Sequence, residues 1–106
     1  MTAGYKTQIA DILKAAARIE ERTRGLSREN ILLDHAVVRA VEEDLSRIGK
    51  AVGDLPATIR QRYPAIDWSA WSGIVSPGRD ALWDLAAQKV PAFEVQVKRI
   101  FLDITD

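Results

Sequence analysis

The chain has 106 residues, of which 47% are hydrophobic and 28% are charged, and 15 basic residues balance 15 acidic ones. This length suits a single domain, over residues 1–106, with one modest core. The balanced charge predicts no general attraction for nucleic acid, although a local basic patch stays open. The absence of cysteine excludes disulfides and thiolate-based sites. No apolar run approaches the roughly 18 residues of a membrane span, and no signal peptide is recognisable, so we expect a cytoplasmic protein.

The first helix is predicted over residues 5–24, where apolar side chains recur at three- and four-residue spacing. Gly25 follows it and is a natural C-terminal stop. Ser27 is a candidate N-cap for a short helical segment over residues 28–33. Asp34 can cap the next helix in the same way.

The most regular helix is predicted over Val37–Leu55, because its apolar residues follow a three-four repeat that is typical of a bundle seam. Gly49 lies inside this helix. An interior glycine costs about 1 kcal/mol relative to alanine. We therefore expect another backbone to pack closely against Gly49.

A connector follows, with Pro56 and Pro64 on either side of a short turn at Ile59–Tyr63. Asp67 can then cap a short helix that carries Trp68 and Trp71. Both tryptophans are expected to pack in the core or at an interface, although stacking on bases is an alternative.

The last helix is predicted from about Asp80 to the C-terminus, after the Pro77-Gly78 turn. Pro91 falls inside it and should kink or restart it. No segment shows the two-residue alternation of a strand. The sequence therefore predicts an all-α bundle.

Several segments, in this order and spacing, resemble the HepT-like proteins of the HEPN superfamily over about residues 8–102. They are Arg18-Ile-Glu-Glu-Arg-Thr-Arg-Gly-Leu-Ser27, Ile48-Gly-Lys-Ala-Val52, Arg62-Tyr-Pro-Ala-Ile-Asp-Trp68 and Gly73-Ile74. The resemblance implies a HEPN-like up-and-down bundle of about four main helices plus short helical segments. It also implies homodimers, RNA as substrate without metal or other cofactor, and a bacterial toxin–antitoxin system with a nucleotidyltransferase-type antitoxin.

The chain departs from the family pattern at the position of the family's catalytic motif. In the family, Arg-Asn-x-x-x-His-x-Tyr directly follows a Gly-Met pair. Here, only Val-Ser-Pro-Gly-Arg lies between Gly73-Ile74 and Asp80, and the family pattern is longer by about eight residues, roughly two helical turns. The resemblance therefore assigns no catalytic residue to any position of this chain.

Two weak candidates for a replacement site remain. His35, the single histidine, has Arg39 one turn later on the same helix face and could form a ribonuclease pair with it, or both could simply be solvated. Arg79 could bind phosphate or RNA at a helix start, or could be a surface arginine beside Asp80.

The adjacent acids Glu20-Glu21 and Glu42-Glu43-Asp44 are expected on solvated faces, because neighbouring residues point in different directions around a helix. No Glu-x-x-His spacing indicates a metal site.

We thus expect a HepT-like component of a toxin–antitoxin pair that has lost catalysis and binds a nucleotidyltransferase-type partner, RNA or both. An active ribonuclease with a rewired site and a purely structural dimeric adaptor are the alternatives. A homodimer is expected through the Val37–Leu55 helix, with an interface at Val41, Leu45, Ile48, Gly49 and Trp71.

Overall fold

The computed structural model describes residues 3–72, 74 and 79–104. Its elements in chain order are α1 (Ala3–Thr23), α2 (Arg28–Leu33), α3 (His35–Asp54), α4 (Ala57–Arg62), α5 (Trp68–Ser72), α6 (Arg79–Asp84), a π-helical segment η1 (Leu85–Lys89) and α7 (Val90–Ile104). Within these described residues no strand occurs. The predicted all-α bundle is confirmed.

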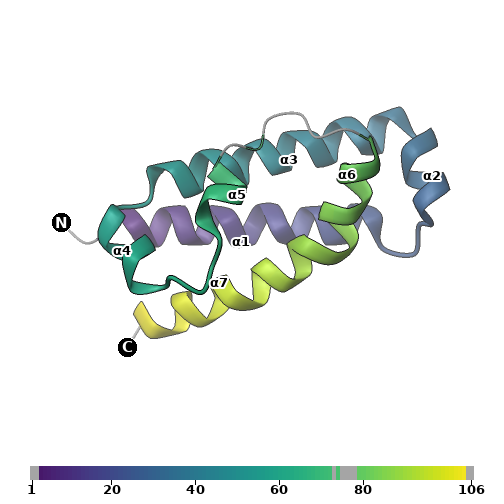
Figure 1. Cartoon of the computed structure of the whole chain (residues 1–106). Coiled ribbons are helices and arrows are strands. Elements are labelled where there is room, and N and C mark those ends of the chain that lie inside the picture. The colour runs from purple at the N-terminus through teal and green to yellow at the C-terminus, as the bar shows by residue number, and fades with distance from the viewer. Residues whose placement is uncertain (1–2, 73, 75–78, 105–106) are drawn as a thin grey trace.

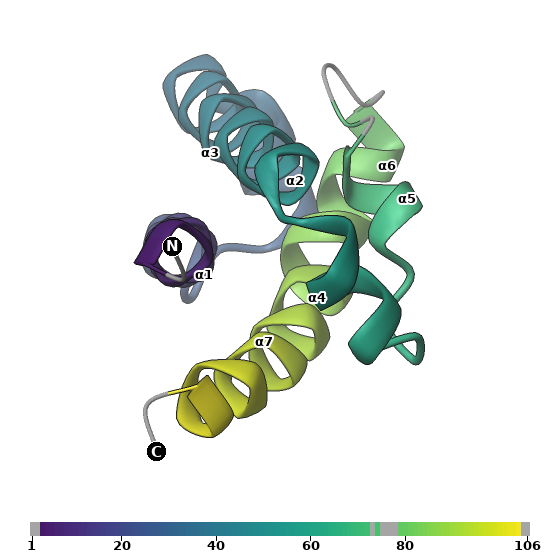
Figure 2. The same ribbon diagram turned by 90° about the vertical axis from the view of Figure 1, so that its left-hand side faces the viewer.

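The long helices α1, α3 and α7 form the frame of the molecule. α1 and α3 run side by side, and α7 also packs along α1 (Figure 1). Seen from one end, the short helices α4, α5 and α6 lie on the side of the bundle away from α1 (Figure 2). α5 packs on α3, and α6 contacts both α2 and α3. In the described part of the chain, no helix is long and apolar enough to cross a membrane.

The core lies between these three long helices. It is made of side chains that the helical periodicity places on one face of each: Ile9, Ile12, Ala16 and Ile19 of α1, Val41, Leu45, Ile48 and Val52 of α3, and Phe93, Val97 and Ile100 of α7. Removing this apolar surface from water is the main favourable contribution to the fold.

The helix ends follow the predicted capping chemistry. Gly25 terminates the α1 region with a φ of 76°, in the left-handed range that favours glycine. The Ser27 side chain accepts a hydrogen bond from the backbone N–H of Asn30 at 3.1 Å. The Asp34 carboxylate accepts from the N–H groups of Ala36 and Val37 at 3.1 and 3.2 Å. These caps satisfy amide donors that have no partner inside their own helix.

At Gly49, α3 lies close to the backbone of α5 and of the residues that follow it. A Cβ atom at this position would lie 2.9 Å from the carbonyl oxygen of Trp71 and 3.1 Å from that of Ile74. The close backbone packing predicted from the interior glycine is therefore confirmed.

Two tryptophans complete the core on the α5 side. The Trp71 ring stacks on Phe93 of α7, with centroids 4.3 Å apart and an interplanar angle of 15°. The Trp68 ring meets the same phenylalanine edge-on at 6.0 Å. Both tryptophans are buried within the single chain, which agrees with the core packing that was one of their two expected roles.

The helix is irregular just before Pro91, where a kink or a restart was predicted. The helix does not stop; it widens into η1, and the backbone N–H of Val90 donates to the carbonyl oxygen of Leu85 five residues earlier. Proline has no N–H and its ring collides with the carbonyl four residues before it. A π-helical turn ahead of Pro91 lets α6 continue into α7 without a break.

Candidate functional site

The junction between α5 and α6 is where the family's catalytic motif would lie. Ile74 is still tied to α5, because its N–H donates to the carbonyl oxygen of Trp71 at 3.2 Å. Gly73 and residues 75–78 are outside the described residues, as is the side chain of Arg79. By sequence, Val75-Ser-Pro-Gly78 contains no histidine, carboxylate or amine. This connection therefore supplies no side chain that exchanges protons near neutral pH.

A groove of about 480 Å³ lies beside this junction, between α5 and the η1–α7 region. Its walls are mainly apolar and include Trp71, Ile74 and Phe93. Its charged residues are Asp67, Asp84 and Lys89, and the Lys89 ammonium lies 3.6 Å from the Asp84 carboxylate. Two carboxylates against one paired amine make this groove a poor site for phosphate.

His35 and Arg39 lie on one face of α3, as their spacing predicts. Both side chains are exposed and line a shallow depression. Every other described residue that lines this depression also belongs to α3: Ala36, Ala40 and Glu43. Within the described part of the chain, the pair therefore has no second wall from another helix that could hold a substrate against it.

The five residues predicted as a dimer interface occupy the interior of the single chain. Val41, Leu45 and Ile48 are fully buried, Gly49 touches the α5 backbone, and Trp71 is 7% exposed. Their contacts here are intramolecular, and the homodimer stays a prediction.

The prediction that the whole acidic run Glu42-Glu43-Asp44 lies on a solvated face is wrong for one residue. Asp44 does not lie on a solvated face: its side chain is 1% exposed and points between α3 and α1. Its Oδ1 accepts hydrogen bonds from Arg18 Nε at 2.9 Å and from Arg47 Nη1 at 2.8 Å. Arg22 Nε lies 3.6 Å from Oδ2. Sequence analysis missed this arginine cluster, defined by Arg18, Arg22, Arg47 and Asp44.

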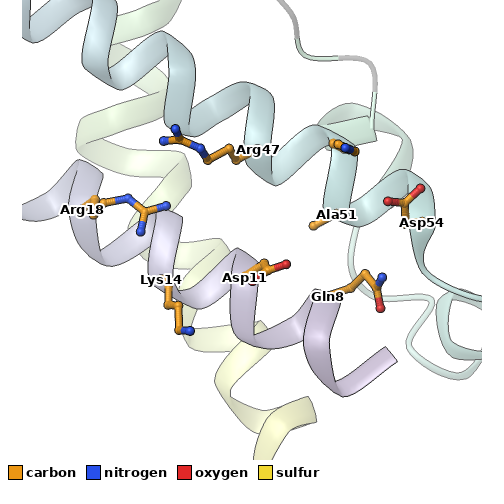
Figure 3. A pocket seen from close by; sticks show the side chains of 8 residues that line it. Gln8, Asp11, Lys14, Arg18, Arg47, Ala51 and Asp54 are labelled. Atoms are coloured by element: carbon orange, nitrogen blue, oxygen red, sulfur yellow. The ribbon is translucent and has the colours of Figure 1, made fainter. Parts of the chain in front are cut away.

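The arginine cluster stands at one end of a groove between α1 and α3 with a volume of about 370 Å³. Figure 3 shows Arg18 and Arg47 together at this end, while Gln8 and Asp54 lie at the other. Two arginines thus stand at one end of the groove and one carboxylate, Asp54, at the other. Among the residues described, no group of three or more potential metal ligands is present.

Two carboxylates, Glu20 of α1 and Glu94 of α7, lie close together where α1 packs against α7. Glu94 is 8% exposed, and the Lys98 ammonium lies 3.5 Å from it. Burial between the helices raises the pKa of Glu20 above its ordinary value of 4.5. The charge of Glu94 and a hydrogen bond to it raise the pKa further, against the smaller opposing effects of Lys98 and Arg24.

Glu20→Gln is expected to increase stability at neutral pH. Folding raises the pKa of Glu20, so the folded chain binds the proton more tightly than the unfolded chain. The resulting contribution to the free energy of unfolding is fully present below pH 4.5 and is lost as the pH rises through the folded-state pKa. Glutamine stays neutral throughout. Urea midpoints measured from acid to neutral pH should fall less for Glu20→Gln than for the unmodified chain. The exposed neighbour Glu21, changed to Gln, is the matched control for the loss of one carboxylate from α1.

Comparisons with known proteins identify the family of this chain. A family profile described as "Ribonuclease HepT-like" matches residues 12–74, so the match ends directly before the junction. The chain is 30% identical to "Putative RNase TTE0752" of Caldanaerobacter subterraneus subsp. tengcongensis, with 84% of this chain and 87% of the relative aligned. It is 29% identical to "Putative RNase MJ1216" of Methanocaldococcus jannaschii, with 93% and 88% aligned. No solved structure matches at a comparable level of significance. On the family match and the bacterial relative together, this chain belongs to the HepT-like ribonuclease family.

Proposed function

We propose that this chain is a non-catalytic HepT-like component of a toxin–antitoxin pair, which acts by binding a nucleotidyltransferase-type protein, RNA or both. One observation carries the proposal: the single histidine is on the exposed face of α3, and the connection between Ile74 and α6 holds no proton-transferring side chain. RNA cleavage without a metal needs a general acid or base at the scissile phosphate.

The lengths of the alignments support this proposal. The comparison with the Caldanaerobacter relative runs over 101 positions but contains 84% of the 106 residues, or about 89. The comparison with "Putative RNase MJ0127" runs over 102 positions and contains 89%, or about 94. About twelve and about eight positions of these relatives therefore have no counterpart here. This difference has the size of the shortening that we infer between Ile74 and Asp80.

The first test is cleavage of RNA. We expect the purified chain to leave a labelled RNA or tRNA intact at neutral pH without metal, because no histidine stands at the junction. The readout is product formation on a denaturing gel, with an unrelated RNase as positive control. Cleavage that persists in repurified protein and disappears in His35→Ala would overturn the proposal.

An active enzyme with a rewired site is the alternative that this assay decides. The shared depression of His35 and Arg39 favours it, since a histidine and an arginine are the residue types that move protons and hold phosphate. In that case, His35→Ala and Arg39→Gln should each reduce cleavage, whereas Glu43→Gln in the same depression should reduce it much less.

The binding role has its own test. Co-expression with a nucleotidyltransferase-type antitoxin from the same organism should give a complex that co-elutes in size-exclusion chromatography, with light scattering to determine the mass of each species. The same measurement on the chain alone tests the proposed homodimer. If the chain elutes unchanged beside that partner and also fails to retain RNA, the binding role is wrong.

A further inference from the structure

The arginine cluster concentrates positive charge in a chain whose net charge is zero. Three guanidinium groups surround one carboxylate, so the cluster carries two positive charges more than Asp44 neutralises. No other acid is within ion-pair distance of Arg18, Arg22 or Arg47 among the pairs that the described residues form. The surplus is therefore local and faces solvent.

The guanidinium groups contact the buried carboxylate of Asp44 on one side and are open to solvent on the other. Asp44 is buried and binds Arg18 through Nε and Arg47 through Nη1. The side chains of Arg18, Arg22 and Arg47 nevertheless keep 39%, 46% and 58% of their surface exposed. Each guanidinium has five N–H donors, and Asp44 uses only a small part of them. Arg18 and Arg47 line the groove, so their remaining donors are available to a ligand that approaches from it.

Asp44 also reduces the entropy that the arginine side chains would lose on binding a ligand. An exposed arginine normally loses rotamer freedom when it binds a ligand, which weakens the interaction. Here α1 presents Arg18 and Arg22 one turn apart, and the buried carboxylate on α3 draws them toward Arg47. The three groups are thus gathered before any ligand arrives.

We propose that Arg18, Arg22 and Arg47 form a binding site for a phosphate dianion at the arginine end of the α1–α3 groove. Two surplus positive charges match a dianion, and the oxygens of a phosphate accept hydrogen bonds from guanidinium groups in several directions at once. Lys14 and Lys50 also line the groove, together with the acids Asp11 and Asp54. In Figure 3 the Lys14 side chain extends away from α3, so it is not a direct ligand.

This site is separate from the α5–α6 junction and does not require the proposed function to be correct. The phosphate group could belong to a small molecule, such as inorganic phosphate or a mononucleotide, or to the terminal phosphate of an RNA. The chemistry recognised by the three arginines is the same in each case. The experiment must therefore first detect phosphate itself and then distinguish its sources.

Inorganic phosphate is the first probe. At mildly alkaline pH and constant ionic strength, two-dimensional NMR of the amide resonances should show saturable shifts confined to α1 and α3 near the cluster. The affinity should be roughly millimolar, as suits a small ligand. Arg22→Gln and Arg47→Gln should each weaken binding by about tenfold, whereas Arg99→Gln, at an exposed position on α7, should leave it unchanged. Both cluster variants should remain folded, because these side chains are about half exposed.

The second probe compares a short oligoribonucleotide that carries a 5′-phosphate with the same sequence ending in a 5′-hydroxyl. A preference for the phosphorylated form that Arg47→Gln abolishes would identify an RNA end as a source, while equal affinity would leave the small phosphate as the ligand. The proposal is overturned if phosphate gives no saturable shift, or if Arg99→Gln weakens binding as much as Arg22→Gln. If phosphate binds but neither RNA does, the site stands and the RNA-binding part of the proposed function fails.

Discussion

Replacing Gly49 by alanine is expected to lower the free energy of unfolding by about 2 kcal/mol, although alanine is the better helix former. The new Cβ atom would lie 2.9 and 3.1 Å from the carbonyl oxygens of Trp71 and Ile74. These are backbone atoms, so no side-chain rotation relieves the contact. Overpacking of this kind costs about 3 kcal/mol at the upper end of its range, and the gain in helix propensity of about 1 kcal/mol offsets only part of it.

Gly53 provides the matched control on the same helix. A Cβ atom there would meet nothing within 4 Å, and the residue is exposed. Gly53→Ala should therefore stabilise the protein by about 0.5 kcal/mol through helix propensity and a restricted unfolded chain. Urea denaturation of both variants measures the difference. Equal effects of the two substitutions would show that α5 does not press on α3 at Gly49 as the structure has it.

The close approach at Gly49 was predictable from sequence because an unfavourable residue in a regular pattern demands a local reason. The helix caps were predictable for a similar cause: the side chains of Ser27 and Asp34 bond to amides two or three residues away. Both signals are contained within a short segment. They need no knowledge of which helices meet.

Asp44 was missed although part of its signal is local. It lies three residues after Val41 and four before Ile48, so helical spacing places it on the buried face of α3. Because Asp44 belongs to the charged run Glu42-Glu43-Asp44, it was assigned to the solvated face by its charge and not to the buried face by its helical position. The partner Arg18 is 26 residues away in the chain, and only the packing of α1 on α3 brings the two together. That pairing could not be predicted from the spacing of either helix.

The contacts of Trp71, like those of Asp44, depend on helix packing that the spacing of residues does not reveal. The sequence predicted that Trp71 packs in the core or at a dimer interface, but not which residues it contacts. In the structure its ring stacks on Phe93, from a helix that begins nineteen residues after Trp71. The burial of an aromatic side chain can be predicted from composition, but the surface that buries it depends on how α5 and α7 are arranged around α3.

Asp44→Ala is expected to lower the free energy of unfolding by about 3 kcal/mol. The substitution removes two charge-assisted hydrogen bonds, each of which contributes about 1.5 to 3 kcal/mol, and it leaves a gap at a fully buried position. The three arginines then repel one another without a counter-charge. Part of this loss is recovered because their exposed guanidinium groups regain water, so the total stays below the sum of the separate effects.

Glu43→Ala separates this effect from a general loss of acidic charge on α3. Glu43 is exposed and neighbours Asp44 in sequence, so its removal should change stability by no more than about 0.5 kcal/mol. Asp44→Asn should fall between the two, since asparagine keeps the shape and one acceptor but not the charge. High salt should reduce the deficit of Asp44→Ala only in part, because salt screens the repulsion between arginines and does not restore the lost hydrogen bonds. If Asp44→Ala is as stable as Glu43→Ala, the cluster does not hold α1 to α3, and the arginines would no longer be fixed in advance for a phosphate.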